Sequence, residues 1–149
     1  MIFETLDTYG HEQVVFCHNP DAGLKAIIAV HNTVLGPALG GVRMRSYIRS
    51  EDALTDALRL SRTMTYKNAL AGLNVGGGKA VIIGDSTQDK TEVLFRAFGR
   101  YVDSLGGRYI TAEDVGTDVN DMENVYRETE YVVGVHQVHG GSGDPAPFT

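Results

Sequence analysis

Two lysines, Lys67 and Lys79, occupy positions where a solvated lysine is not expected. Lys67 lies three residues after Met64 on a predicted helix, so it shares the apolar face of that residue. Lys79 lies between three glycines (76–78) and the apolar run 80–83, which is typical of a buried strand. Burying an ammonium group is unfavourable unless it meets an anion or loses its proton. The two lysines therefore predict a site that binds a carboxylate and transfers protons.

Each candidate residue also has an ordinary structural interpretation, which is the more frequent one for a single residue. Lys67 would extend its charge into water from a helix end. Lys79 would be an edge-strand lysine that keeps other strands away. Asp114, a third candidate just after a predicted strand, would hydrogen-bond its own backbone in a turn before Gly116. Considered one at a time, these residues leave the site undecided.

Two glycine-rich stretches accompany these candidates. The triple glycine does not match a phosphate-binding loop, which needs Gly where Leu73 stands and Ser or Thr where Ala80 stands. No Gly-x-Gly-x-x-Gly opens a helix after a strand, so the sequence has no dinucleotide motif. The triple glycine is better explained as a place where backbone and ligand come close. The second stretch, 35–41, is either a connector or a loop in which Gly40 and Gly41 let a ligand approach the backbone.

Composition and charge limit the function classes. The chain has 149 residues, 42% of them apolar, which suffices for one domain with a substantial core. A net charge of -6 argues against a general nucleic-acid-binding protein. No apolar run approaches membrane-spanning length, no signal peptide is recognisable, and the single Cys17 cannot form an internal disulfide, so a cytoplasmic protein is expected. The five histidines lack metal-ligand spacing, so no metal site is predicted.

The elements that must position the candidates alternate between strand and helix. Residues 12–18 and 24–31 predict two strands joined by the turn 19–23, hence an antiparallel hairpin. Helices are predicted at 50–71, 91–105 and 119–127, and further strands at 79–83, 108–112 and 131–135. This order predicts an α/β fold with a mixed, mostly parallel sheet, flanking helices and an opening antiparallel hairpin.

Four segments carry a more specific signal: 36–44 (GPALGGVRM), 64–68 (MTYKN), 71–79 (AGLNVGGGK) and 108–117 (RYITAEDVGT). They resemble the NAD-dependent amino acid dehydrogenases, the family of leucine dehydrogenase and its relatives that act on valine, phenylalanine or tryptophan. The resemblance runs nearly end to end, over the family's N-terminal substrate domain. It implies that residues 1–139 form a substrate-binding, catalytic and oligomerising domain. Residues 140–149 would begin the linker to an NAD-binding domain that is absent from this chain.

The resemblance also implies a role for each candidate residue. Lys67 would bind the substrate α-carboxylate as a point charge. Lys79 would be the general base that activates water, with its pKa lowered by burial and a nearby cation. Asp114 would exchange protons with the substrate nitrogen and that water. Four residues would contact the substrate, the two glycines at its backbone and the others at its side chain: Gly40, Gly41, Leu39 and Met64.

The function implied by this resemblance is reversible oxidative deamination of L-leucine or a similar branched-chain amino acid by a homo-oligomer. The segment 112–114 and the apolar pocket walls favour leucine, whereas Val42 and Arg45 depart from the usual leucine-enzyme residues. A phenylalanine- or tryptophan-type enzyme is the first alternative, and a stand-alone binding or assembly module without redox chemistry is the second. The chain alone is expected to be inactive, because nothing in it holds NAD.

Lys79 and Asp114 pose a geometric problem for a shared site. Lys79 begins its predicted strand, whereas Asp114 follows the end of another. If these strands were parallel neighbours, the two residues would lie at opposite sheet edges, roughly 15 Å apart at about 3.3 Å per residue. A shared site would require that the glycine run folds back or that the two strands run in opposite directions.

Overall fold

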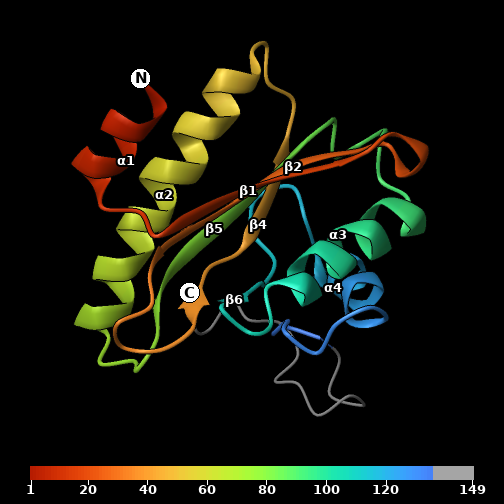
Figure 1. Ribbon diagram of the computed structural model, residues 1–149. Coiled ribbons are helices and arrows are strands. Elements are labelled where there is room, and N and C mark those ends of the chain that lie inside the picture. Colours follow the sequence, from red (N-terminus) through yellow and green to blue (C-terminus); the bar gives the residue numbers. More distant parts are fainter. Residues whose placement is uncertain (136–149) are drawn as a thin grey trace.

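A mixed sheet runs through the centre of the computed structural model, which describes residues 1–135 (Figure 1). In spatial order its strands are β1 (Gln13–Asn19), β2 (Leu24–Asn32), β5 (Gly76–Ile83), β3 (Ala38–Leu39) and β6 (Tyr109–Ile110), and β4 (Val42–Arg45) also pairs with β5. β2 is antiparallel to both β1 and β5, whereas the pairs β3–β5, β4–β5 and β3–β6 are parallel. The predicted mixed sheet and its opening hairpin are confirmed.

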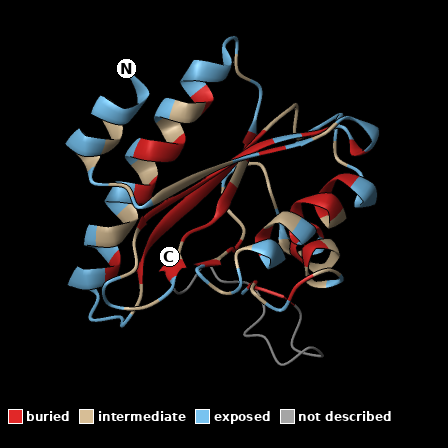
Figure 2. Ribbon diagram, viewed as in Figure 1, coloured by how far each residue is buried: buried red, intermediate tan, exposed pale blue. Residues whose placement is uncertain are grey.

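Helices cover both faces of this sheet (Figure 1). α1 (Ile2–Tyr9) and α2 (Ser50–Leu70) lie on one face, α3 (Glu92–Ser104) and α4 (Val119–Tyr126) lie on the other, and η1 (Pro20–Ala22) is a 3-10 turn in the hairpin. Figure 2 shows that burial is concentrated in the strands and in the sides of α2 and α3 that face them. The α2 side of the core is a small cluster of buried apolar residues: Ile27, Ala29, Ala53, Ala57, Leu58 and Val81. The α/β architecture with flanking helices is therefore as predicted.

Several local predictions differ from the structure. The stretch 35–41 is not a connector, because it contains β3 and leads directly into β4. The predicted strand 131–135 is wrong, since the only ladder contact there among the described residues is an isolated bridge from Thr111 to Val132. α1 was not predicted at all. The proposed linker, 140–149, lies outside the described residues.

The triple glycine belongs to the sheet, since β5 begins at Gly76 and not at Lys79. A Cβ on Gly76 would overlap the backbone carbonyl of Asn32, and a Cβ on Gly77 would overlap the backbone of α2. A Cβ on Gly78 would lie 2.8 Å from the Tyr109 ring. These glycines are therefore required by the packing of the protein against itself, which the sequence interpretation of a ligand contact did not foresee.

A cluster of polar groups and rings joins α1 and the hairpin to α2. His11 Nε2 lies 2.7 Å from Ser61 Oγ, and the His31 ring meets the His11 ring edge-on at 4.7 Å. His31 also lies 2.7 Å from Thr65 Oγ1 and 2.6 Å from the Tyr9 carbonyl oxygen. Burial, reinforced by the neighbouring His31, lowers the pKa of His11 to about 4. His11 is therefore neutral in the folded protein near neutral pH.

We expect the free energy of unfolding to decrease as the pH falls from about 6.5 towards 4. In this range His11 is protonated in the unfolded state but stays neutral in the folded state, so protonation favours unfolding. His11→Gln keeps a donor for Ser61 and removes this titration, so its stability should fall less, by about 1 kcal/mol between pH 7 and 5 after allowance for solvent screening. Urea unfolding at both pH values measures the difference. The matched control is His18→Gln, which replaces an exposed histidine by the same residue. Identical pH dependence in wild type and His11→Gln would contradict the expectation.

Candidate functional site

The predicted site residues on the sheet lie on the face that α2 covers. Gly77 packs directly against the α2 backbone and Val81 belongs to the α2 side of the core. Lys79 lies between these two residues on the same strand, so by alternation its side chain emerges on the same face. Leu39 pairs with Gly77, and Arg43 of β4 pairs with Val81, which places both on this face as well.

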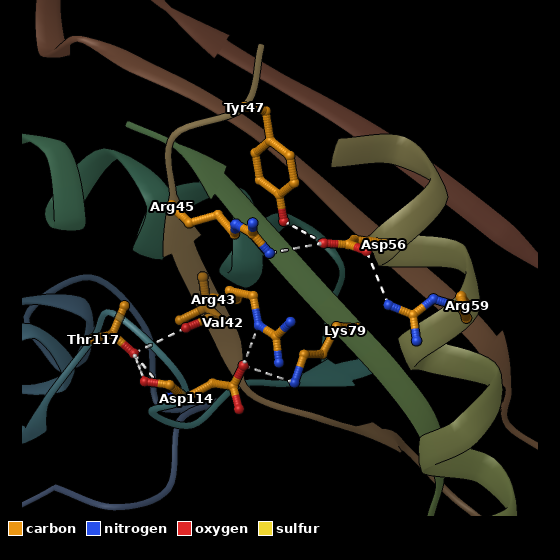
Figure 3. A network of polar contacts seen from close by, with 9 residues as sticks. All are labelled: Val42, Arg43, Arg45, Tyr47, Asp56, Arg59, Lys79, Asp114 and Thr117. Carbon is orange, nitrogen blue, oxygen red and sulfur yellow. Dashed lines mark hydrogen bonds and ion pairs between the residues drawn. The ribbon is translucent and has the colours of Figure 1, made fainter. Parts of the chain in front are cut away.

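Lys79 and Asp114 are in direct contact. Lys79 Nζ contacts Asp114 Oδ2 (Figure 3). The two atoms are 3.0 Å apart, and the Lys79 side chain is only 6% exposed. β5 has hydrogen-bonded neighbours on both sides, so Lys79 is on a central strand and the edge-strand interpretation of this lysine is wrong. The buried amino group of Lys79 is thus paired with a carboxylate, which reduces the free-energy cost of burying its charge.

The distance problem is solved in a way that the sequence did not suggest. The strands are parallel, and the glycine run does not fold back. Because β5 starts at Gly76, Lys79 is its fourth residue. Beyond β6 the chain continues beside β4, where Glu113 bridges to Val42, and Val42 itself pairs with Ala80. Asp114 is therefore carried forward to the level of Lys79.

The turn at Asp114 is closed by Thr117, not by the aspartate side chain. The Asp114 N–H donates to Thr117 Oγ1 at 2.9 Å, and the Thr117 N–H donates to the Asp114 carbonyl at 3.1 Å. The Thr117 hydroxyl donates to the Val42 carbonyl at 2.9 Å, which ties the turn to β4 (Figure 3). The carboxylate of Asp114 is thereby left to contact Lys79 and Arg43, so the interpretation of Asp114 as a side chain that hydrogen-bonds its own backbone is wrong.

The electrostatics of the pair favour proton transfer. Burial lowers the pKa of Lys79; the Asp114 carboxylate opposes this change, and the positive charges of Arg43 and Lys67 add to it. Burial raises the pKa of Asp114, but the charges and hydrogen bonds of Lys79 and Arg43 outweigh it, so the pKa lies below the usual value. A lysine with a lowered pKa thus lies beside a carboxylate whose pKa is also lowered, an arrangement that suits general acid–base chemistry.

Lys67 and Met64 come from the C-terminal part of α2. Lys67 lies in the last turn of this helix and is exposed, in agreement with the structural interpretation, although its charge still acts on Lys79. Met64 is partly buried one turn earlier. The next residue after Lys67, Asn68, is buried and donates from Nδ2 to the Gly76 carbonyl at 2.8 Å and the Leu39 carbonyl at 3.3 Å. Asn68 therefore ties the end of α2 to two strands that carry predicted site residues.

Gly40 and Gly41 are needed by the backbone around the site. A Cβ on Gly40 would overlap the carbonyl oxygen of Gly78, and a Cβ on Gly41 would lie 2.9 Å from Asp114 Cβ. The Gly40 carbonyl also accepts a 2.7 Å hydrogen bond from the buried Tyr109 hydroxyl. Close strand packing accounts for both glycines, and a contact with substrate at these positions stays a prediction.

Arg43 lies beside Asp114 and Lys79, and the sequence interpretation missed it. Its Nε donates to Asp114 Oδ2 at 3.1 Å, and its side chain is only 19% exposed. It is not among the candidate residues named in the sequence analysis. The available signal was the alternation of Val42 and Met44 with Arg43 and Arg45, which is typical of a strand with one charged face.

Within residues 1–135, neither the triple glycine nor the His, Cys, Asp and Glu side chains form a phosphate loop or a metal-binding group. The triple glycine lies inside β5, where its Cβ positions are filled by backbone and by Tyr109, so it forms no phosphate cradle. Residues 1–135 contain no group of three or more His, Cys, Asp or Glu side chains able to hold a metal ion. Within the same residues, no helix is long and apolar enough to cross a membrane.

Known amino acid dehydrogenases are similar to this chain in sequence. Residues 11–131 match the family described as Glu/Leu/Phe/Val dehydrogenase, dimerisation domain. The chain is 62% identical over 148 residues to leucine dehydrogenase of Geobacillus stearothermophilus, covering 99% of this chain and 40% of that protein. It is 58% identical over 139 residues to phenylalanine dehydrogenase of Caldalkalibacillus thermarum, covering 93% and 38%.

A solved structure gives the same result for the fold. The crystal structure of L-tryptophan dehydrogenase from Nostoc punctiforme superimposes with a TM-score of 0.87 at 55% identity, over 90% of this chain and 40% of that one. The chain thus spans about 40% of the length of relatives that differ in the amino acid they are named for. The family resemblance read from the sequence is confirmed: this chain belongs to the Glu/Leu/Phe/Val dehydrogenase family and corresponds to its N-terminal, dimerisation domain.

Proposed function

We propose that this chain is the substrate-binding and catalytic part of an NAD-dependent amino acid dehydrogenase that deaminates L-leucine or a similar branched-chain amino acid. The observation that carries the proposal is the 3.0 Å contact between buried Lys79 and Asp114. The positively charged Lys67 acts on the same lysine from α2. A proton acceptor, an ionised carboxylate and a fixed cation together suit the removal of an amino group next to a carboxylate.

In this mechanism each side chain has one task. Lys67 binds the substrate α-carboxylate as a point charge. Neutral Lys79 takes a proton from the water that attacks the imine carbon, and Asp114 exchanges protons with that water and with the substrate nitrogen. Gly40 and Gly41 lie along the substrate backbone. The products are the 2-oxo acid and ammonia.

NAD supplies the acceptor for the hydride that leaves the substrate Cα. The glycine-rich segments of this chain are used within the sheet, so the proposal places NAD mainly on the rest of the complete protein. Residues 1–139 would then form the substrate and assembly domain and 140–149 the start of the linker. For the same reason, the chain alone should not reduce NAD in the presence of L-leucine.

The substrate side chain is assigned from the pocket walls. Leu39 and Met64 are apolar and only partly buried, so they are available to a branched aliphatic side chain. The identities of 62% to a leucine enzyme and 58% to a phenylalanine enzyme are too close to decide the side chain by themselves. The deciding experiment is NADH formation by the complete protein with L-leucine, L-valine, L-phenylalanine and L-tryptophan.

Each outcome of that experiment has a meaning. Preference for an aliphatic substrate would support the proposal in full. Preference for an aromatic one would keep the mechanism and overturn the assignment of leucine. No activity with any of the four would favour a binding or assembly module, a function that the family's description as a dimerisation domain also suits. In every case we propose a cytoplasmic homo-oligomer, in line with the free, buried Cys17.

Lys67→Ala in the complete protein should raise KM for L-leucine by about 10- to 100-fold and change kcat much less. The reason is that a fixed charge which holds the α-carboxylate contributes about equally to the ground state and the transition state. Lys67→Arg, which keeps the charge, should recover part of the affinity. Steady-state kinetics with varied L-leucine measure this split. A loss confined to kcat would argue that Lys67 acts in the chemical step instead.

A further inference from the structure

Arg43 makes a contact that the proposed mechanism does not use. Its Nε and the Lys79 Nζ both lie against the same carboxylate oxygen, Asp114 Oδ2, at 3.1 and 3.0 Å (Figure 3). Arg43 is brought there by strand register, because it pairs with Val81, two residues along β5 from Lys79 and on the same face. The contact joins β4 to the segment after β6, across 71 residues of sequence.

We propose that Arg43 is a positioning residue for the reaction, which holds the Asp114 carboxylate in place against Lys79. A charge-assisted hydrogen bond from a largely buried guanidinium is among the stronger contacts a carboxylate can make. Thr117 fixes the backbone of Asp114 separately. The aspartate is therefore held at its backbone by Thr117 and at its carboxylate by Arg43. This inference rests on the proposed function, in which Lys79 and Asp114 transfer protons.

The same contact has an electrostatic consequence that follows from counting charges. One carboxylate cannot balance both the buried Lys79 and the partly buried Arg43, and a guanidinium does not give up its proton in a protein. Of the two cations, the lysine is therefore the one that can release a proton, as a general base must, and the charge of Arg43 lowers its pKa further. If Arg43 were removed, Asp114 would be left to Lys79 alone and would favour the protonated lysine.

The other charged groups around the pair are consistent with this role for Arg43. Lys67 on α2 also disfavours the charged form of Lys79, but it lies in the exposed last turn of its helix. The charge of Arg43 also lowers the pKa of Asp56 on α2. The Asp56 carboxylate, however, already accepts hydrogen bonds from the Tyr47 hydroxyl at 2.7 Å and from Arg59 at 3.0 Å. Asp114 is thus the carboxylate to which Arg43 donates.

Arg45 provides a matched control on the same strand. It lies two residues after Arg43, pairs with Ile83 on the same face, and reaches Asp56 at 3.9 Å while its side chain is 58% exposed. Arg43→Met and Arg45→Met each remove one positive charge from β4. The proposal predicts an effect on Lys79 only for Arg43→Met.

The first measurement is the titration of the Lys79 side chain in the full 149-residue chain, followed by NMR of carbon-13-labelled lysine. Arg43→Met should move the Lys79 titration upward by about one pH unit. Arg43→Lys should stay close to wild type, and so should Arg45→Met. If Arg43→Met does not fold, Arg43→Gln decides the question, because it is also neutral but keeps a polar donor. An unchanged Lys79 titration in the neutral Arg43 variant would overturn the proposal.

The second measurement is the pH dependence of kcat/KM in the complete protein. The acidic limb, where Lys79 loses its proton, should move about one unit higher in Arg43→Met, with about a tenfold loss of kcat/KM on that limb and recovery in Arg43→Lys. An unmoved limb in Arg43→Met would count against the proposal. If the complete protein has no amino acid dehydrogenase activity, the proposed function fails, whereas the Lys79 titration still decides whether Arg43 controls the pair.

Discussion

Replacing Lys79 with alanine in the complete protein is expected to lower kcat for L-leucine deamination by about 10²- to 10⁴-fold. Lys79 lies 3.0 Å from Asp114, is buried on a central strand, and has its pKa lowered by burial. Under the proposed function, the variant loses the group that takes the proton from water. Among residues 1–135, Arg43 then remains as the direct cationic partner of Asp114. NADH formation at saturating L-leucine measures the loss.

Two further lysine variants separate the chemistry from the structure. Lys79→Arg keeps a positive charge near Asp114 but cannot act as a base at ordinary pH, so it should be nearly as inactive as Lys79→Ala. Lys25→Ala removes an exposed lysine from β2 and should retain wild-type kcat. Near-wild-type turnover in Lys79→Ala, or in Lys79→Arg, would contradict the assignment of Lys79 as the general base.

Gly40→Ala is expected to destabilise the folded chain by roughly 3 kcal/mol, the largest stability effect that we predict. The added methyl group would overlap the backbone carbonyl of Gly78, and backbone in a central strand cannot move away as a flexible side chain would. Relief of the clash would disturb the residue that precedes Lys79. Urea unfolding of wild type and variant measures the change in the free energy of unfolding.

Gly72→Ala is the matched control for this substitution. Gly72 follows α2 with φ +74° and has nothing within 4 Å of its Cβ position, so alanine there adds only the left-handed backbone strain of about 1–2 kcal/mol. A Gly40→Ala chain with wild-type stability and weakened substrate binding would show that Gly40 is needed for the ligand and not for the packing of strands.

Local features of the fold were predictable from the sequence because their causes are local. The hairpin turn is made by Asn19, whose side chain accepts from the Ala22 N–H, and by Gly23 at φ +71°. The predicted start of the second long helix is confirmed by Thr91, which caps α3 at the Leu94 N–H. The predicted end of α2 agrees with the left-handed glycine at position 72. Turns and helix caps depend on interactions between residues that are close in sequence, so these positions can be predicted without knowledge of the tertiary structure.

The candidate pair was also within reach of the sequence, although its geometry was not. A lysine in an apolar run and an aspartate after a strand are unusual enough to be noticed, and the family motifs gave them a shared role. Their 3.0 Å contact depends on where β5 begins and on how far the chain runs beside β4. Glycines carry no strand signal, so the start of β5 at Gly76 could not be recognised.

Sequence by itself thus determined the family, the α/β class, the hairpin and the unusual lysine on a buried strand. Only the tertiary structure decided that Arg43 shares a carboxylate oxygen with Lys79, and that the glycines make room for other parts of the chain. Both depend on strand register, since moving a strand by one residue would turn Arg43 to the opposite face of the sheet. Register is fixed by the packing of whole layers, which no short stretch of residues encodes.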